Sequence, residues 1–216
     1  MPGFFMPVVC QPILCIMPEL PEVETTRRGI EPWLAGQRIR RLQVHERRLR
    51  WPVPRGLERK LAGQQIHHVS RRAKYLLLAL DTGTLIVHLG MSGSLRLVSP
   101  ETPRLKHDHI ELQLENGHCL RYCDPRRFGA WLWTTGEPAA HPLLADLGPE
   151  PLENTFSANY LRQKLQGRRQ SVKVLIMDNH IVVGVGNIYA NEALFMAGIH
   201  PQRSGTSLTL TECRLL

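Results

Sequence analysis

Short apolar runs with polar residues at alternating positions dominate the chain between residues 37 and 135. Successive side chains of a strand point to opposite faces, so such alternation is typical of half-buried β-strands. Glycine, proline and asparagine separate the runs, and the close spacing of the runs predicts an antiparallel sandwich or barrel. The expected strands are Gln37–Val44, Lys74–Leu80, Thr84–Leu89, Ser94–Val98, His109–Leu114, His118–Tyr122 and Ala130–Trp133.

A helix is predicted ahead of these strands. Val23, Ile30 and Leu34 fall on one helical face, and Gly36 is a suitable stop. Proline and acidic residues crowd the first turn, where both are favourable. Taken alone, the start of this segment is an ordinary capped amphipathic helix.

Beyond residue 148 the pattern changes from alternation to helical periodicity. The turn-rich residues 148–154 predict a linker. Helices are expected at Ser157–Gln166, at Val172–Met177 and at Asn187–Ala197, with Asn187 as an N-cap. A capping-box pattern at Thr209–Glu212 predicts one more helix, and the chain ends four residues later. Because so short a helix is not stable on its own, we expect an element that is cut short.

The expected organisation is two domains behind a leader. The leader is apolar and uncharged, its prolines break helical continuity, and it is too short to span a bilayer, so it is expected to be disordered or a start-site artefact. The predicted parts are a leader at 1–16, a β-sandwich domain at 17–148, a linker at 149–155 and an incomplete helical domain at 156–216.

Charge and cysteine content narrow the class of protein. A net charge of +8 and a pI near 9.7 suit a polyanionic partner such as nucleic acid. Five cysteines, an odd number without a Cys-x-x-Cys pair, argue against a disulfide framework and against an intact structural zinc site. We therefore expect free thiols in a reducing cytoplasm.

Five motifs follow one another along the chain. They are MPELPEVET at 17–25, RRAKY at 71–75, HLGMSG at 88–93, DPRRFG at 124–129 and VGVGNIYANE at 183–192. With them, the chain from Met17 to Leu216 closely resembles the bacterial formamidopyrimidine-DNA glycosylase family, whose members remove oxidised purines and nick the abasic strand. The resemblance implies an α+β fold, with an N-terminal helix and a two-layer antiparallel β-sandwich followed by a helix–two-turn–helix module. The chain departs from the family's pattern in its leader and in the absence of the C-terminal zinc finger. No cofactor is therefore expected in this chain, whereas one structural zinc is expected in full-length members.

The resemblance gives the first motif a chemical role. Pro18 would be the nucleophile and Glu19 the adjacent acid/base, with Glu22 ordering water. A free N-terminal proline is a secondary amine that can attack a sugar carbon and form an iminium. In the printed chain Pro18 follows Met17, so its nitrogen is a tertiary amide and not a nucleophile.

Three further motifs carry residues that alone would be unremarkable. Lys74 would by itself be a solvated strand end, and with the family it is a proton donor in β-elimination or a phosphate contact. Met91 and Phe128 are suited as apolar wedges that fill the hole left by an extruded base, and Arg126 suits the orphaned partner base. Without the resemblance, the motif around Arg126 would be interpreted as a charged turn and Met91 as an ordinary packing residue.

DNA-backbone contacts are expected elsewhere. The Gly184–Asn187 turn precedes a predicted helix, whose backbone N–H groups could hold a phosphate. By resemblance, His107 and Arg168 match DNA-contacting positions and Asn187 lies in the helix–two-turn–helix turn. Val174 stands where the family leads us to expect proline.

These observations predict a bifunctional DNA glycosylase and abasic-site lyase of base-excision repair. Its expected partner is double-stranded damaged DNA, and it is expected to be a monomer, away from membranes, in the bacterial cytoplasm near the nucleoid. Two alternatives stay open, namely a protein that binds damaged DNA without cutting it because Pro18 is blocked, and a truncated product without function.

Overall fold

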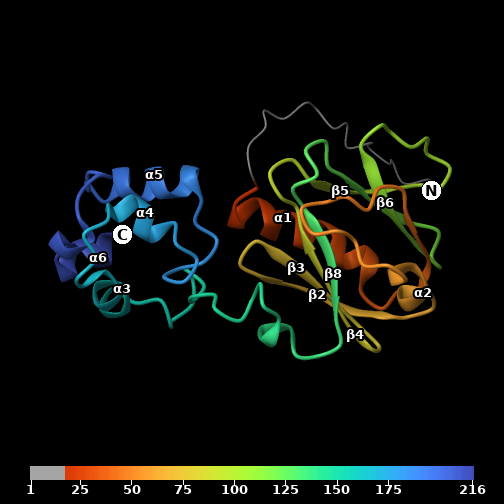
Figure 1. The fold of residues 1–216 in the computed structure, drawn as a ribbon, viewed down its shortest axis with the longest axis horizontal. Helices are drawn as coiled ribbons and strands as arrows, with labels where there is room; N and C mark the ends of the chain where they lie inside the picture. The colour runs from red at the N-terminus through yellow and green to blue at the C-terminus, as the bar shows by residue number, and fades with distance from the viewer. Residues whose placement is uncertain (1–17) are drawn as a thin grey trace, which may run out of the picture.

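The computed structural model describes residues 18–216. These residues form a β-sandwich half and a helical half, which lie side by side with helix α1 (Leu20–Leu34) near their junction (Figure 1). The expectation of a leader at residues 1–16 lies outside the described residues. Within residues 18–216, every helix is too short or too polar to cross a membrane.

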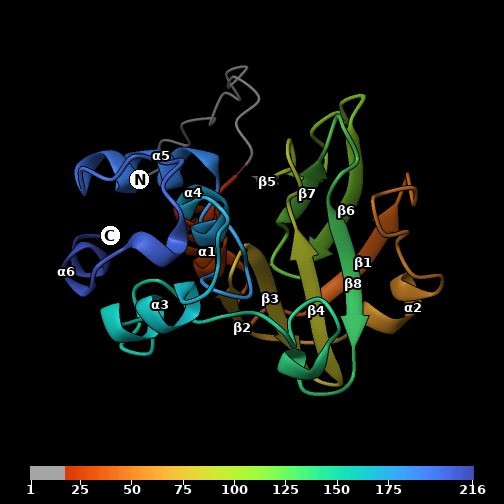
Figure 2. The same ribbon diagram turned by 60° about the vertical axis from the view of Figure 1, so that its left-hand side comes forward.

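The sandwich consists of two four-stranded antiparallel sheets. One sheet has the order β1 (Ile39–Val44), β6 (Asp108–Leu114), β7 (Cys119–Cys123) and β5 (Ser94–Val98). The other has the order β2 (Ile66–Arg72), β3 (Tyr75–Leu80), β4 (Gly83–His88) and β8 (Ala130–Thr134). The strands of both sheets can be followed in the turned view (Figure 2). Their facing side chains, including Leu78, Leu112 and Trp131, are fully buried in one core, so the predicted α+β sandwich is confirmed.

Two elements of this half are absent from the sequence prediction. Strand β2 was missed because it is mostly polar and its two buried residues, Ile66 and Val69, are three apart instead of two or four. A register shift between Ile66 and His68 brings both to the same face. Helix α2 (Leu57–Leu61) was missed because it is only five residues long.

The helical half has its own core. It contains α3 (Ala158–Leu165), α4 (Val172–Ile176), α5 (Asn187–Met196) and α6 (Leu210–Leu215), together with the 3₁₀ turn Gly205–Ser207, and a second 3₁₀ turn, Pro138–Ala140, precedes the linker. Leu161, Leu175 and Leu194 meet in a cluster separate from the sandwich core. This half therefore packs as a unit of its own.

Two of its helices begin as the sequence predicts. Ser157 Oγ accepts the Tyr160 N–H at 3.2 Å, and Thr209 forms a capping box with Glu212. The prediction that Asn187 caps α5 was wrong, because Gly186 is the N-cap and Asn187 the first helical residue.

Candidate active site and DNA interface

The start of helix α1 places the first chemical group at the junction. Glu19 is the N-cap in an extended conformation, and its backbone N–H donates to Glu22 Oε2 at 2.9 Å. This capping box fixes where the helix begins, and Pro18 immediately precedes it. The Pro18 ring is half-buried beside the Glu19 backbone.

The Glu19 carboxylate reaches across to the helical half. Its side chain is almost fully buried, at 1% exposure. It accepts backbone N–H groups at the start of α5, from Gly186 at 2.9 Å, Ile188 at 2.8 Å and Tyr189 at 3.2 Å. An anion at a helix N-terminus satisfies otherwise unpaired donors and interacts favourably with the helix dipole. The sequence predicted a phosphate at this turn, whereas these three N–H groups bind a carboxylate of the protein itself.

Gly186 is required at this contact by close approach. A Cβ on Gly186 would lie 2.3 Å from Glu19 Cδ, which is far inside van der Waals contact. The Tyr189 hydroxyl adds a second link, donating to Glu22 Oε1 at 3.3 Å. Neither contact could be predicted from the sequence, because the two partners of each are 167 residues apart.

Lys74 completes the acid/base group. It is half-buried, and burial lowers its pKa, while the charges of Glu19 and Glu22 oppose that shift. The turn that carries Lys74 lies against α1, because Arg71 of that turn pairs with Glu24 of α1 at 3.1 Å. The two motifs that supply Pro18, Glu19 and Lys74 are therefore neighbours in the fold.

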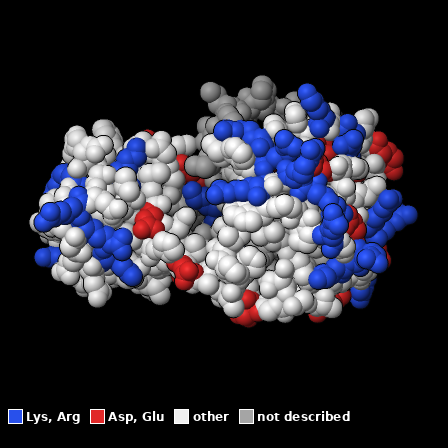
Figure 3. All heavy atoms as spheres, viewed as in Figure 1, with Lys and Arg blue, Asp and Glu red and all other residues white. Residues whose placement is uncertain are grey.

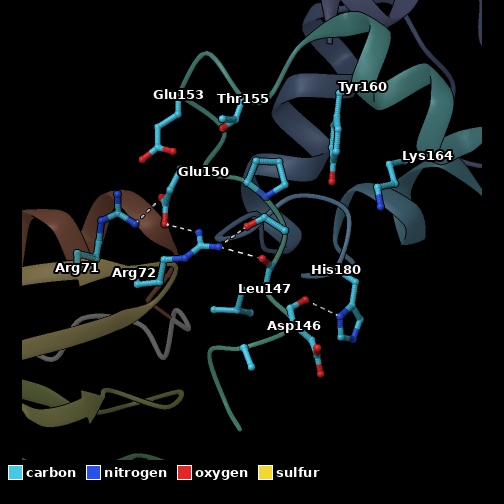
Figure 4. Close-up of a pocket in the computed structure, with 13 residues that line it drawn as sticks. Arg71, Arg72, Asp146, Leu147, Glu150, Glu153, Thr155, Tyr160, Lys164 and His180 are labelled. Carbon is cyan, nitrogen blue, oxygen red and sulfur yellow. Dashed lines mark hydrogen bonds and ion pairs between the residues drawn. The ribbon is translucent and has the colours of Figure 1, made fainter. Parts of the chain in front are cut away.

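A buried glutamate of the linker supports the turn that carries Lys74. Glu150 accepts the Ala73 N–H at 2.7 Å and pairs with Arg71 at 2.7 Å and Arg72 at 3.1 Å. Figure 4 shows both arginines turned toward Glu150, where they line a cavity of about 700 Å³. Burial alone would raise the pKa of Glu150, but these donors hold it below its usual value. Ala73 adopts φ +52°, a left-handed conformation that costs energy without glycine and is held by these contacts.

The other predicted constellation also comes together in space. Met91, Arg126 and Phe128 line one cavity of about 630 Å³ on the sandwich half, with Arg48 and Arg50 beside them. The Phe128 ring is 41% exposed, and the Arg126 guanidinium lies 5.0 Å from its centroid. A partly exposed aromatic ring with a cation over its face is a kind of side chain that can insert between bases.

His88 also lines this cavity. Its Nδ1 accepts the Gly90 N–H at 3.0 Å, and its ring packs on Tyr75 with centroids 4.7 Å apart. Burial, aided by the positive charges of Lys74 and Arg50, lowers the pKa of His88 from 6.5 to about 4. His88 is therefore neutral at physiological pH, with Nδ1 as the acceptor.

The remaining predicted residues are distributed over both halves. His107 ends the loop before β6, and its carbonyl accepts the Asp124 N–H at 3.0 Å. Arg168 is exposed on the helical half, with Nη1 3.8 Å from Asp178 Oδ2, and Asn187 is exposed at the first turn of α5. Lys and Arg side chains gather on the face shown in Figure 3, over the sandwich and toward the junction. A metal-binding group of three or more His, Cys, Asp or Glu side chains is absent from residues 18–216.

Two cores joined through the buried Glu19 carboxylate, a cavity lined by Met91, Arg126 and Phe128, and a cationic face together indicate the class of two-domain DNA glycosylases. A family model described as the formamidopyrimidine-DNA glycosylase N-terminal domain matches residues 17–131, and one described as the formamidopyrimidine-DNA glycosylase H2TH domain matches residues 147–216. The chain belongs to the formamidopyrimidine-DNA glycosylase family.

Similar proteins agree with this assignment. The chain is 60% identical over 200 residues to the formamidopyrimidine-DNA glycosylase of Hydrogenovibrio crunogenus, covering 93% of this chain and 71% of the relative. It is 62% identical over 193 residues to that of Stutzerimonas stutzeri, covering 89% of this chain and 71% of the relative. The Lactococcus lactis enzyme, solved non-covalently bound to DNA containing an abasic site, superimposes with a TM-score of 0.85 at 34% identity, covering 92% of this chain and 76% of that one.

Proposed function

We propose that this chain is a base-excision DNA glycosylase with abasic-site lyase activity, acting on oxidised purines such as formamidopyrimidines and 8-oxoguanine in duplex DNA. The observation that carries the proposal is the buried Glu19 carboxylate, which follows Pro18 and accepts three backbone N–H groups at the start of α5. Family membership supports a catalytic function over the alternative of a protein that binds damaged DNA without cutting it.

The proposed chemistry begins at Pro18. Its amine attacks C1′ of the damaged nucleoside, the N–C1′ bond forms, and the bond from C1′ to the base breaks as the base takes up a proton. Glu19 then assists sugar-ring opening, in which O4′ gains a proton and the iminium forms. The C2′ proton then passes to the Glu19 carboxylate as the bond from C3′ to the 3′ phosphate breaks, which nicks the strand. Lys74 is the proposed proton donor in this elimination, because a lowered pKa makes its ammonium a stronger acid.

The residues that line the Met91–Phe128 cavity would hold the opened duplex. Met91 and Phe128 fill the space of the extruded nucleotide, and Arg126 presents its donor fork to the base left unpaired. His107, Arg168 and Asn187 are proposed as phosphate contacts, which give affinity without reading sequence.

The attack requires a free amine at Pro18, and this requirement gives the test. We predict that a form beginning at Pro18 is trapped covalently on abasic-site DNA by borohydride. A form that keeps Met17 and is otherwise identical is not trapped, because its Pro18 nitrogen is an amide. Equal trapping of the two forms would remove Pro18 from the mechanism and direct attention to Lys74.

Other expectations stay proposals with their own tests. Limited proteolysis would test the domain boundaries 17–148, 149–155 and 156–216, and metal analysis would test the expectation of no cofactor in this chain and one zinc in longer relatives. Sedimentation would test the monomer, and cell imaging would test a cytoplasmic, nucleoid-associated location away from membranes.

A further inference from the structure

A single buried carboxylate joins the two loops that carry the proposed wedge residues. The Met91 loop (residues 89–93) connects β4 to β5, and the Phe128 loop (residues 124–129) connects β7 to β8. Asp124 is fully buried, at 0% exposure. Its Oδ1 accepts the Ser92 hydroxyl at 2.7 Å, and its Oδ2 accepts the Gly129 N–H at 2.9 Å and the Tyr122 hydroxyl at 2.8 Å.

Ser92 closes the link from the other side. Its Oγ donates to Asp124 and accepts the Arg126 N–H at 3.2 Å. The Ser92 hydroxyl therefore connects the Met91 loop to the backbone of Arg126. Linked hydrogen bonds in a buried site reinforce one another, so the chain from Gly129 through Asp124 and Ser92 to Arg126 holds both loops.

The backbones of the two loops also touch. A Cβ on Gly90 would lie 2.4 Å from the Phe128 carbonyl carbon, and a Cβ on Gly129 would lie 1.8 Å from the Tyr122 hydroxyl oxygen. The first contact joins the two loops directly, and the second packs the Phe128 loop against the Tyr122 side chain of β7. Hydrogen bonding and close packing thus both oppose independent movement of the two loops.

We propose that Ser92 and Asp124 are positioning residues that join Met91, Arg126 and Phe128 into one rigid unit, so that filling the base stack and reading the opposite base happen together. The inference rests on the proposed function, because it assumes that these three side chains enter opened DNA. Ser92 itself touches neither sugar nor base in this scheme. It fixes the backbone from which Arg126 reaches the unpaired base.

Substitutions at Ser92, made in the form that begins at Pro18, test the proposal. Ser92→Ala removes the link, Ser92→Thr keeps a hydroxyl, and Thr134→Val removes a hydroxyl that accepts the Gly136 N–H at the other end of β8. Single-turnover excision of 8-oxoguanine is measured opposite each of the four bases, with the melting temperature of each variant as a check on folding. Ser92→Ala is expected to lower the discrimination between opposite bases about five- to tenfold, while the two control variants keep it.

A double-mutant cycle separates positioning from simple packing. If Ser92 acts through Arg126, adding Ser92→Ala to Arg126→Ala changes the discrimination less than about twofold. Effects of the two substitutions that multiply, or a Ser92→Ala variant that keeps the wild-type discrimination between opposite bases, would overturn the proposal.

A measurement without catalysis keeps the two proposals distinguishable. With DNA carrying a non-cleavable abasic analogue opposite 2-aminopurine, stopped-flow fluorescence follows wedge insertion directly. Ser92→Ala should slow this phase about tenfold, and unchanged insertion would contradict the coupling. Normal insertion by the Pro18 form without any base excision would instead count against the proposed function alone.

Discussion

At the scale of single residues, burial decides which groups are charged where DNA would lie. Lys74 and His88 are both driven toward their neutral forms by desolvation. Glu19 and Glu22 oppose the lowering of the Lys74 pKa, whereas the opposing charge of Asp124 on His88 is countered by the positive charges of Lys74 and Arg50. Lys74 is thereby suited to exchange a proton. His88 instead stays an acceptor and holds the Gly90 N–H at the base of the Met91 loop.

The His88 pKa predicts a specific acid sensitivity. Above pH 6.5 the imidazole is neutral in both the folded and unfolded chain, so it adds no pH dependence. As the pH falls from about 6.5 to about 4, the unfolded chain binds a proton that the folded chain resists, and unfolding becomes more favourable. The free energy of unfolding should fall by about 3 kcal/mol more between pH 7 and pH 4 in the wild type than in His88→Asn.

Denaturant titrations across this pH range measure the difference. Asn is a useful comparison because its side-chain oxygen can take the place of Nδ1 as acceptor but does not titrate. Parallel pH profiles for the two proteins would show that His88 is not the group responsible.

At the scale of elements, the accuracy of the sequence prediction follows how local the determining interactions are. Helix α6 was predicted because its capping box lies within four consecutive residues, and β3 because Leu76, Leu78 and Leu80 alternate. Strand β2 was not predicted because a bulge, set by its pairing with β3, breaks the alternation of apolar and polar residues. The N-cap of α5 at Gly186 was not predicted because the partner of Gly186, Glu19, belongs to another element.

The contact between α1 and α5 predicts opposite effects for two glycine-to-alanine changes. Gly186→Ala places a Cβ against Glu19 Cδ and should displace the carboxylate, lowering single-turnover excision by at least about 10²-fold through loss of acid/base assistance. Gly29→Ala in α1 meets no atom within 4 Å and should raise stability by roughly 0.5–1 kcal/mol without lowering excision. Wild-type excision by Gly186→Ala would show that the carboxylate does not depend on this cap.

At the scale of the whole molecule, two independently packed cores are held together by polar contacts. Glu19 binds the start of α5, and the Leu20 N–H donates to the Gly184 carbonyl at 3.3 Å. The predicted site residues could be named from motifs, but the contacts that unite them could not, because a pattern in sequence does not specify which distant donor meets which acceptor. Glu150, Asp124 and Tyr189 became visible as supports only in three dimensions.

The positive face predicts a strong dependence of DNA affinity on salt. Each phosphate contact releases counterions, so Arg168→Ala should reduce the slope of log K against log salt by about one unit. Arg38→Ala is the control, because that guanidinium donates to the Gly63 carbonyl within the sandwich at 2.9 Å and should leave the slope unchanged. Fluorescence titrations over a salt series measure both slopes, and an unaltered slope for Arg168→Ala would remove it from the phosphate contacts.

The bond between Glu19 and Tyr189 also sets a time order for synthesis. Its two ends are 170 residues apart, and a ribosome adding about 5–20 residues per second needs roughly 10–35 s to cover that distance. During this interval the sandwich strands can pair, but the Glu19 carboxylate has not yet met its partners on α5. The nascent chain would therefore carry an unassembled catalytic centre until the helical half emerges, and release of a competent enzyme would coincide with near-completion of the described fold.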